Sequence, residues 1–472
     1  MKFFTNSEFS ADIADIIREY FPNEKLEKAE ADEDCQLSFF VEKFESKEEY
    51  ICKFGETQEK DELLFDDNWS ILQKKRFTKR KSKICVYNCL SKAMNKTLAW
   101  GSLTGIRPTK LAYELKKEGE ADTLSAFKNI FKVPHKKAKL VDDILKNQSG
   151  LINLNDDNYA DFYINIPFCV SRCSYCSFVS GDISKQKHFI EPYINALCHE
   201  IEETKKMIKE GGYKINHLYI GGGTPTSFNV EDLEKILSHI DFEVDEFTVE
   251  AGRPDTITKE KLELFKRVGV NRISINPQTF EQKTLDLINR RHTITDIYVK
   301  FDLARQFGFE INMDLIAGLP GETFENFKNS IDSAVALKPE NITVHTLALK
   351  SGSQMKEESK VSDNENEIEK MLDYASEKVA VEGFVPYYMY RQKYVIGNFE
   401  NVGYCLPGKQ CKYNIDMMEE VANIFACGAN AISKRVFLSQ NRIERAPNVK
   451  DFTNYIERID EMIDRKKRLF LG

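Results

Sequence analysis

Residues 159–176, YADFYINIPFCVSRCSYC, join a strand-like run to a loop with three cysteines. The apolar and aromatic run 159–166 predicts a β-strand, and Pro167, which has no N–H to give to a sheet, ends it. The three cysteines of the loop are Cys169, Cys173 and Cys176. Because three thiolates on one short loop can ligate three irons of a [4Fe–4S] cluster, this spacing predicts a cluster whose fourth iron is open to another ligand.

Two other interpretations of these cysteines remain open. One is a structural zinc site with a distant fourth ligand, although structural zinc usually has four ligands in paired C-x2-4-C spacing and the sequence has no second pair. The other is that the cysteines are ordinary buried side chains. The loop's position directly after a strand favours the cluster.

The pattern after Tyr159 is strand, loop and helix, repeated. Strands are expected at 159–166, 217–220, 247–250, 272–275, 311–316 and 342–347. Helices are expected at 189–208, after Asn229, and at 259–268, 281–288, 295–307 and 322–337. This alternation predicts parallel βαβ units, either as an open doubly wound sheet or as a partial α/β barrel. Both place ligands at the carboxyl ends of the strands.

The chain is expected to have three parts: an N-terminal α+β domain at 1–155, the α/β part at 156–350 and a helix-rich C-terminal extension at 351–472 that covers the substrate. The extension is predicted to open with an acidic helix, 363–381, followed by the aromatic and basic segment VPYYMYRQK, 385–393.

Composition limits the function classes. The chain has 67 Lys and Arg against 75 Asp and Glu, a net charge of −8, which argues against a general nucleic-acid-binding surface. No stretch approaches the roughly 18 consecutive apolar residues of a membrane span, and the first residues turn polar too soon for a signal peptide. We therefore expect a cytoplasmic protein whose cysteines are thiols.

A glycine turn follows the second expected strand. Residues 221–226 read GGGTPT. Glycine allows a backbone to approach a ligand closely, and N–H groups at a helix start favour anionic or polar groups. Tight turns between strand and helix use glycine in any case, so the turn alone leaves both interpretations open.

Three polar residues lie in or after later strands: Glu250, Gln278 and Asp314. A carboxylate in a buried strand is costly unless it is paired or hydrogen-bonded. These residues are candidates for binding a polar ligand; the alternative is that the backbone satisfies them.

The cysteine loop, with Tyr175 before the third cysteine, and the GGTP segment at 222–225 together resemble the radical S-adenosylmethionine (SAM) superfamily. The resemblance implies a partial (βα)6 barrel and a [4Fe–4S] cluster whose open iron binds SAM. It also implies reductive cleavage of SAM to a 5′-deoxyadenosyl radical that takes a hydrogen atom from the substrate.

Longer segments resemble the oxygen-independent coproporphyrinogen III oxidase branch: YINIPFC (163–169), LYIGGGTPT (218–226), NRISINPQTF (271–280) and NMDLIAGLPGET (312–323). GIRPTK (105–110) and YRQKYVIGNFENVGY (390–404) resemble its HemZ-type subgroup. By this resemblance, Tyr163 and the three cysteines are catalytic, and the residues around SAM are Tyr163, Phe168, Tyr175, Gly222, Gly223, Thr224, Glu250, Gln278, Arg290 and Asp314. Arg290 is expected to face the methionine carboxylate.

The resemblance implies oxidative decarboxylation of two propionates of coproporphyrinogen III to vinyl groups in haem biosynthesis, with a reduced flavodoxin or ferredoxin-type electron donor. A flat macrocycle with propionates needs apolar walls and cations, so Arg107, Tyr388, Tyr390 and Arg391 are candidate substrate residues. The alternative is that these tyrosines are core and these arginines surface charge.

Two positions depart from the oxidase pattern: Phe178 replaces a fourth cysteine and Asn165 replaces a histidine. The HemW-type haem chaperones also lack that cysteine but carry an HN-x-x-YW motif, which has no equivalent after Phe384. The alternatives are therefore haem binding and transfer, another radical SAM reaction on a tetrapyrrole, or a barrel without a cluster.

Overall fold

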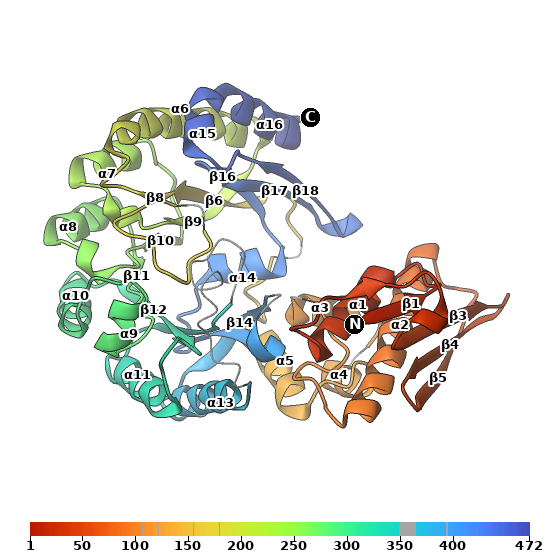
Figure 1. Cartoon of the computed structure of the whole chain (residues 1–472). Coiled ribbons are helices and arrows are strands. Elements are labelled where there is room, and N and C mark those ends of the chain that lie inside the picture. The colour runs from red at the N-terminus through yellow and green to blue at the C-terminus, as the bar shows by residue number, and fades with distance from the viewer. Residues whose placement is uncertain (106, 121, 154, 179, 349–364, 393–394) are drawn as a thin grey trace. The chain divides into compact units, whose positions relative to one another are not determined.

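The chain folds as two compact units, seen here in a computed structural model that describes residues 1–105, 107–120, 122–153, 155–178, 180–348, 365–392 and 395–472 (Figure 1). The first unit comprises residues 1–142 and 391–399, and the second comprises 143–390 and 400–472. The expected barrel and its C-terminal extension thus form one unit. The expected boundary at 350 lies outside the described residues, and the three-part division stays a prediction.

The first unit is an α+β fold. Its five-stranded sheet has the order β2-β1-β3-β4-β5. The strands are β1 (Lys2–Thr5), β2 (Glu27–Lys28), β3 (Leu37–Lys43), β4 (Lys47–Phe54) and β5 (Thr57–Leu64). The helices are α1 (Ser10–Tyr20), α2 (Ile71–Met94), α3 (Pro108–Lys117), α4 (Thr123–Asn129) and α5 (His135–Asn147), and α5 runs across the division between the units. A shared core joins α1 and α2 to the sheet.

The basic run at 74–83 lies in α2, where acidic side chains of the same unit pair with it. Lys79 lies 2.7 Å from Asp12, and Lys81 lies 2.7 Å from Asp61. Arg80 pairs with Glu118 at 3.1 Å. The run is therefore an ion-paired helix face of this unit.

The second unit contains the expected partial barrel. Its six parallel strands, in the order β13-β12-β11-β10-β9-β6, form the middle of an eleven-stranded sheet. They are β6 (Tyr159–Ile166), β9 (Lys214–Gly222), β10 (Glu246–Glu250), β11 (Arg272–Ser274), β12 (Glu310–Ala317) and β13 (Asn341–Thr346). The prediction of a radical SAM-type (βα)6 barrel is confirmed.

Helices cover the convex side of this sheet, and one helix occupies its concave side (Figure 1). The outer helices are α6 (Lys187–Gly211), α7 (Val230–Leu237), α8 (Lys259–Arg267), α10 (Ile294–Gln306), α11 (Phe324–Ala336) and α13 (Glu365–Val381), with α9 (Gln282–Leu287) between β11 and α10. The inner helix is α14 (Lys412–Glu419). Short 3-10 turns lie at 32–34, 225–227, 254–256, 396–398 and 438–440.

The C-terminal part has the expected helices and, in addition, strands that the sequence analysis did not predict. It contains helices α13, α14, α15 (Phe452–Glu457) and α16 (Ile459–Leu471), but it also adds strands to both edges of the barrel sheet. These strands are β14 (Val385–Arg391), β15 (Glu400–Cys405), β16 (Asn423–Cys427), β17 (Ile432–Phe437) and β18 (Arg442–Pro447). β16 pairs parallel to β6, and β15 pairs antiparallel to β13. Residues 363 and 364 of the expected acidic helix lie outside the described residues.

Glu246, the first residue of β10, positions the inner helix α14. Its carboxylate accepts hydrogen bonds from the backbone N–H groups of Lys412 and Tyr413, at 3.0 and 3.1 Å. These N–H groups have no partner within the helix, and the positive end of the helix dipole favours a carboxylate there. The amino-terminal end of the barrel strands is therefore closed by a helix from the C-terminal part.

A buried ion pair fastens α16 to α6. Lys466 Nζ lies 2.8 Å from Glu200 Oε1, and the side chains are 1% and 0% exposed. Lys466 also donates to Thr204 Oγ1 at 2.9 Å, and Glu200 Oε2 accepts from the hydroxyl of Tyr455 at 2.5 Å.

Lys466→Met is predicted to destabilise the second unit by about 3–5 kcal/mol, because it leaves the Glu200 carboxylate buried and unpaired. Lys467→Met, which removes an exposed lysine from the next position, is the matched control. Urea unfolding followed by circular dichroism measures both. Equal midpoints for the two variants would contradict the role given to this ion pair.

Candidate active site

The cysteine loop leaves the carboxyl end of β6. Cys169 belongs to the two-residue strand β7 (Phe168–Cys169), which pairs parallel with β8 (Gly181–Asp182). Cys173 and Cys176 lie in the loop, and Cys176 N–H donates to Cys173 O at 3.0 Å. All three thiols are partly exposed. Burial raises the pKa of Cys176 to about 11, so a bound cation is needed to hold this thiol as a thiolate near neutral pH.

The glycine turn after β9 lies against the cysteine loop. Gly223 N–H donates to Ile166 O at 2.8 Å, and Thr224 N–H donates to Phe168 O at 2.7 Å. A Cβ on Gly223 would lie 2.6 Å from Phe168 O, and one on Gly222, whose φ is +109°, would lie 2.2 Å from Asn165 Oδ1. The glycines are required for this close approach. The N–H groups of Gly223 and Thr224 are used within the protein, and the contact of Gly222, Gly223 and Thr224 with SAM stays a prediction.

Arg290 lies beside the loop. Its guanidinium donates to the carbonyl oxygens of Gly252 and Asn276. Although burial acts against the charge, Tyr175 and Cys173 beside it raise the pKa of Arg290, so it carries a fixed positive charge. Its Nε atom is buried and has no hydrogen-bond partner. Arg290 can therefore bind an anionic ligand group next to the cysteines.

Glu250 ends β10 at the same end of the barrel. Tyr219 donates to its Oε1 at 2.6 Å. Burial, helped by the nearby Asp314, raises the pKa of Glu250 to about 7 against the opposing effect of the Tyr219 hydrogen bond. The carboxylate lies under the glycine turn, since a Cβ on Gly221 would lie 2.8 Å from the Glu250 carboxyl carbon. Glu250 can therefore take a cationic ligand group.

Gln278 has a backbone conformation that is unusual for glutamine, with φ +69°. It is held there by hydrogen bonds with β12: Gln278 N–H donates to Asp314 O, and Ile316 N–H donates to Gln278 O. Its buried Oε1 has no hydrogen-bond partner. Non-glycine residues in this region concentrate at functional sites, and an orphaned buried acceptor fits a ligand donor.

The orphaned atoms fit the polar cofactor that the sequence implies. Gln278 Oε1, Asn276 Oδ1, Arg290 Nε and Ser174 Oγ are buried without partners. Ser174 lies in the cysteine loop, Asn276 and Gln278 follow the end of β11, and Arg290 follows α9. Buried polar atoms without partners are rare in folded proteins. The three thiols can ligate an iron–sulfur cluster, and these donors and acceptors can bind a ligand that carries both a positive and a negative group.

Two residues expected around the cofactor have contacts within the protein, and their contact with SAM stays a prediction. The Phe168 side chain is fully buried and packs against Tyr193, Phe228 and Phe452, so its ring is a core ring and only its carbonyl serves the glycine turn. Tyr163 lies inside the barrel, where its hydroxyl donates to Asn165 Oδ1 at 2.9 Å.

The candidate substrate residues are divided between the units. Tyr388 shares a hydrogen bond with Thr343, and Tyr390 shares one with His345 Nδ1, whose ring in turn lies 3.7 Å from Asp314. Both tyrosines therefore belong to the Asp314 side of the barrel.

Arg391 and Arg107 belong to the first unit. The Arg391 guanidinium lies 3.6 Å from Glu19, donates to Leu103 O and covers the ring of Trp100. These contacts give Arg391 a structural role within that unit. Arg107 lies at the amino-terminal cap of α3, and its proposed substrate contact stays a prediction.

Among the described residues, the remaining cysteines form no group of three or more side chains that could hold a metal ion. Cys85 and Cys89 are buried in the core of the first unit. Cys411 contacts Glu246, whereas Cys427 contacts Lys466 and Thr204. Cys405 is buried at the end of β15.

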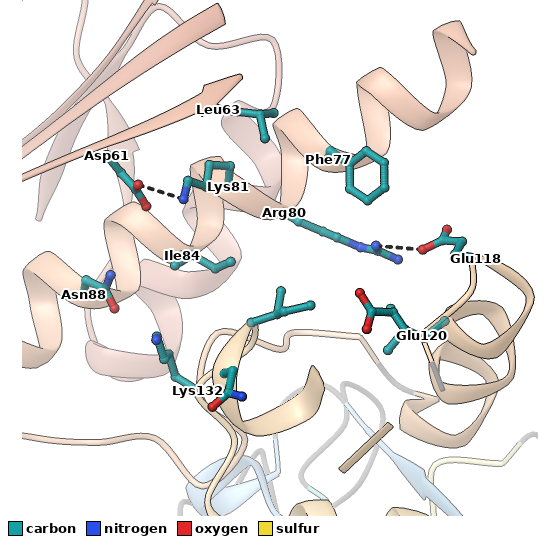
Figure 2. Close-up of a pocket in the computed structure, with 13 residues that line it drawn as sticks. Asp61, Leu63, Phe77, Arg80, Lys81, Ile84, Asn88, Glu118, Glu120 and Lys132 are labelled. Atoms are coloured by element: carbon teal, nitrogen blue, oxygen red, sulfur yellow. Dashed lines mark hydrogen bonds and ion pairs between the residues drawn. The ribbon is translucent and has the colours of Figure 1, made fainter. Parts of the chain in front are cut away.

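A pocket of about 400 Å³ lies in the first unit beside α2 (Figure 2). Figure 2 shows its two ion pairs, Lys81 with Asp61 and Arg80 with Glu118, near the apolar side chain of Phe77. These ion pairs neutralise four charges within the protein, and neither the cysteine loop nor the glycine turn lines this pocket. The candidate active site, which is built on that loop and that turn, lies in the second unit.

The sequence model of the radical SAM superfamily matches residues 163–334, which contain the cysteine loop and the glycine turn. The chain is 39% identical to the oxygen-independent coproporphyrinogen-III oxidase-like protein HemZ of Bacillus subtilis over 412 residues, 84% of this chain and 82% of that protein. The chain belongs to this HemZ-like family of radical SAM proteins. A [4Fe–4S] cluster and SAM are the cofactors that the family implies.

The chain is also similar to proteins with other named functions. The chain is 41% identical to the haem chaperone HemW of Bacillus subtilis over 192 residues, 39% of this chain and 49% of that protein. The solved structure of coproporphyrinogen III oxidase (HemN) from Escherichia coli has a TM-score of 0.52 and 22% identity, and covers 65% of this chain and 71% of that one, which supports the fold. In the described part of this radical SAM protein, no helix has the length and apolar character to cross a membrane.

Sequence reasoning missed two inward-facing aromatic residues of the barrel, Tyr219 and Tyr413. Tyr219 and Tyr413 stack at 4.5 Å between ring centroids, and Tyr163 stacks on Tyr413 at 6.2 Å. The sequence does indicate that the strand residues Tyr163 and Tyr219 face inward. Polar and aromatic residues alternate with apolar ones along β6 and β9, so they share one face of the sheet. Tyr413 comes from the C-terminal part, and no local pattern places it in the barrel.

The affinity of this radical SAM protein for SAM is predicted to fall as the pH falls through 7. Glu250 must be ionised to bind an ammonium group, so binding is expected to be about tenfold weaker at pH 6 than at pH 8. Anaerobic calorimetry measures this. Glu250→Gln removes the pH dependence. Glu19→Gln is the control. Burial likewise raises the pKa of Glu19 to about 7, but Glu19 lies in the first unit, so this variant keeps the pH dependence of SAM binding. A flat pH profile in the unaltered protein contradicts the role of Glu250.

Proposed function

We propose that this chain is a radical SAM oxidoreductase that decarboxylates the propionate side chains of coproporphyrinogen III without oxygen. The 39% identity to the HemZ coproporphyrinogen-III oxidase-like protein supports the substrate class. The observation that carries the chemistry is the cysteine loop packed against the glycine turn, with Arg290 and Glu250 beside it.

In this proposal Cys169, Cys173 and Cys176 hold the cluster, and Arg290 and Glu250 bind the carboxylate and the ammonium of SAM. The bound cluster and SAM supply a 5′-deoxyadenosyl radical that removes a hydrogen atom from a propionate. The protein's own contribution is to orient the ligands and to keep water and oxygen away.

The substrate is proposed to lie on the concave side of the barrel, on the Asp314 side. Tyr390 offers aromatic surface there, whereas Tyr388 is buried in the core beside it, and His345, held between Tyr390 and Asp314, offers a polar group. A carbon dioxide molecule leaves, one electron passes to an acceptor, and a vinyl group remains. A reduced flavodoxin or ferredoxin-type protein is the proposed electron donor, and a cytoplasmic location follows from the same proposal.

One of the two departures from the oxidase pattern has a local structural explanation. Asn165 accepts from the Tyr163 hydroxyl and donates to Ala429 O at 2.6 Å, so its amide joins β6 to the segment after β16. An amide does not titrate, so acid–base work is assigned to other groups. Phe178, two residues after Cys176, is 64% exposed, and its surroundings do not explain the departure.

The second candidate function is haem binding and transfer. It is favoured by the 41% identity to the HemW chaperone over 192 residues. In that case the same site binds SAM and cluster, but haem replaces the porphyrinogen and is passed on unchanged.

Reconstituted protein with SAM, reductant and coproporphyrinogen III is predicted to convert the substrate in two steps, each with the loss of one formic-acid equivalent, as read by anaerobic mass spectrometry. Cys173→Ala abolishes both steps because it removes a cluster ligand. Cys198→Ala, which removes a buried thiol of α6 outside the loop, is the matched control and keeps them.

The other outcomes separate the candidates. Formation of 5′-deoxyadenosine with unchanged porphyrinogen overturns the substrate assignment and retains the radical chemistry. Stoichiometric haem binding without any SAM-dependent loss of substrate identifies the chaperone function. Methylated product, or a second SAM consumed per turnover, indicates a different radical SAM reaction.

A further inference from the structure

Three buried side chains meet inside the barrel, away from the cysteine loop. Asp161 lies on β6, His217 on β9 and Asp416 on α14, and they are 0%, 2% and 1% exposed. Asp161 and His217 are opposite each other in the parallel pairing of β6 with β9. Asn165 lies near the carboxyl end of β6. Asp161 comes four residues before it, which is about 13 Å along the strand. This group of three side chains, Asp161, His217 and Asp416, therefore lies deeper in the barrel than the candidate active site.

One imidazole nitrogen faces both carboxylates. His217 Nδ1 lies 3.0 Å from Asp161 Oδ1 and 3.1 Å from Asp416 Oδ2. The hydrogen bond is formed with Asp416, and neither oxygen of Asp161 has a hydrogen-bond partner. A fully buried carboxylate without a donor is costly, so a group that satisfies Asp161 is missing from this arrangement.

The charges point to a cation. With both carboxylates ionised, the three side chains give a net charge of −1 when the imidazole is protonated and −2 when it is neutral. Among the described residues, His217 is the sole ion-pair partner of either carboxylate. A buried divalent ion balances both carboxylates with the imidazole neutral, and metal-bound histidine is neutral.

We propose that Asp161, His217 and Asp416 bind a divalent transition-metal ion, for which zinc is the probe. The three ligand atoms lie within 4.8 Å of one another. Around a tetrahedral zinc ion, with bonds of about 2.0–2.2 Å, neighbouring ligand atoms are about 3.3 Å apart, so the observed separations need only small shifts. Imidazole and carboxylate ligands suit zinc and its first-row neighbours.

An outer hydrogen bond supports this assignment. The Tyr159 hydroxyl donates to Asp416 Oδ2 at 2.9 Å. Ligating carboxylates in metal sites are usually held by such hydrogen bonds, which fix the orientation of the ligand. Tyr159 is the first residue of β6, two positions before Asp161, so one strand supplies both the ligand and the support.

The ion fastens the C-terminal part to the barrel. Asp416 is in the middle of α14, three residues after Tyr413, whose ring stacks on Tyr219. Tyr219 donates to Glu250. The metal thus positions the helix that carries part of the aromatic wall beside the candidate active site. It is a positioning element, and it does not depend on the proposed decarboxylation.

Protons are the rival to a metal at this site. Burial and Asp416 raise the pKa of Asp161 to about 8, and the two carboxylates, against burial, raise the pKa of His217 to about 10. The experiment must therefore distinguish two states of Asp161, His217 and Asp416. In one they share protons and bind no ion, and in the other they bind a metal ion.

The test measures zinc in the full chain with Cys169, Cys173 and Cys176 all replaced by alanine, so that neither cluster iron nor the thiols of this loop contribute. After dialysis against EDTA, mass spectrometry of the metals is expected to find about one zinc ion per chain. Asp416→Asn in this background is expected to lower the zinc content at least about tenfold. Asp460→Asn, which removes the carboxylate from the exposed His199–Asp460 pair, is the matched control and keeps the zinc.

A second measurement protects the test against a variant that fails to fold. The same chain produced with Co²⁺ keeps all three ligands, and it is expected to show visible bands of a tetrahedral nitrogen and oxygen site without thiolate charge-transfer bands. Absence of zinc from the folded chain together with absence of these cobalt bands overturns the proposal in favour of shared protons. Zinc that persists in a folded Asp416→Asn variant also overturns it.

Discussion

The close contact between the glycine turn and the cysteine loop is the constraint on which the candidate site depends. Two backbone hydrogen bonds, from Gly223 to Ile166 and from Thr224 to Phe168, bind the loop to the end of β9. A side chain at Gly223 would meet a backbone oxygen, which cannot move away as a flexible side chain can. The three cysteines are thereby held at the carboxyl ends of the strands, where parallel sheets bind their ligands.

The second unit is built as one body around this contact. The C-terminal part adds β15 to one edge of the barrel sheet and β16 to the other, and it places α14 on the concave side. Buried charges hold these additions: Glu246 caps α14, and Lys466 pairs with Glu200. The C-terminal part is thus a structural part of the barrel, and the shape of the substrate space depends on it.

Much of the barrel could be predicted from the sequence because its elements are local. The strand 159–166 and the helix face after it follow from period and from Pro167, and the structure confirms β6 at those bounds. The strands of the C-terminal part were missed because they are short and pair with strands far away in the sequence. The alternation of polar and apolar residues along β6 and β9 places Asp161 and His217 on the inner face of the sheet. Asp416 joins them from more than 190 residues away, a distance that no local pattern spans. Arg391 likewise appeared free in sequence, but the first unit holds it.

The central claim is that the three cysteines bind a [4Fe–4S] cluster with one iron open to SAM. Electron paramagnetic resonance of anaerobically reconstituted, chemically reduced protein tests it most directly, with spectra recorded before and after addition of SAM. The account predicts the signal of a reduced [4Fe–4S] cluster that changes its g values when SAM is added and is lost in Cys173→Ala. A cluster signal that SAM leaves unchanged, or a folded protein that takes up no iron, would contradict it.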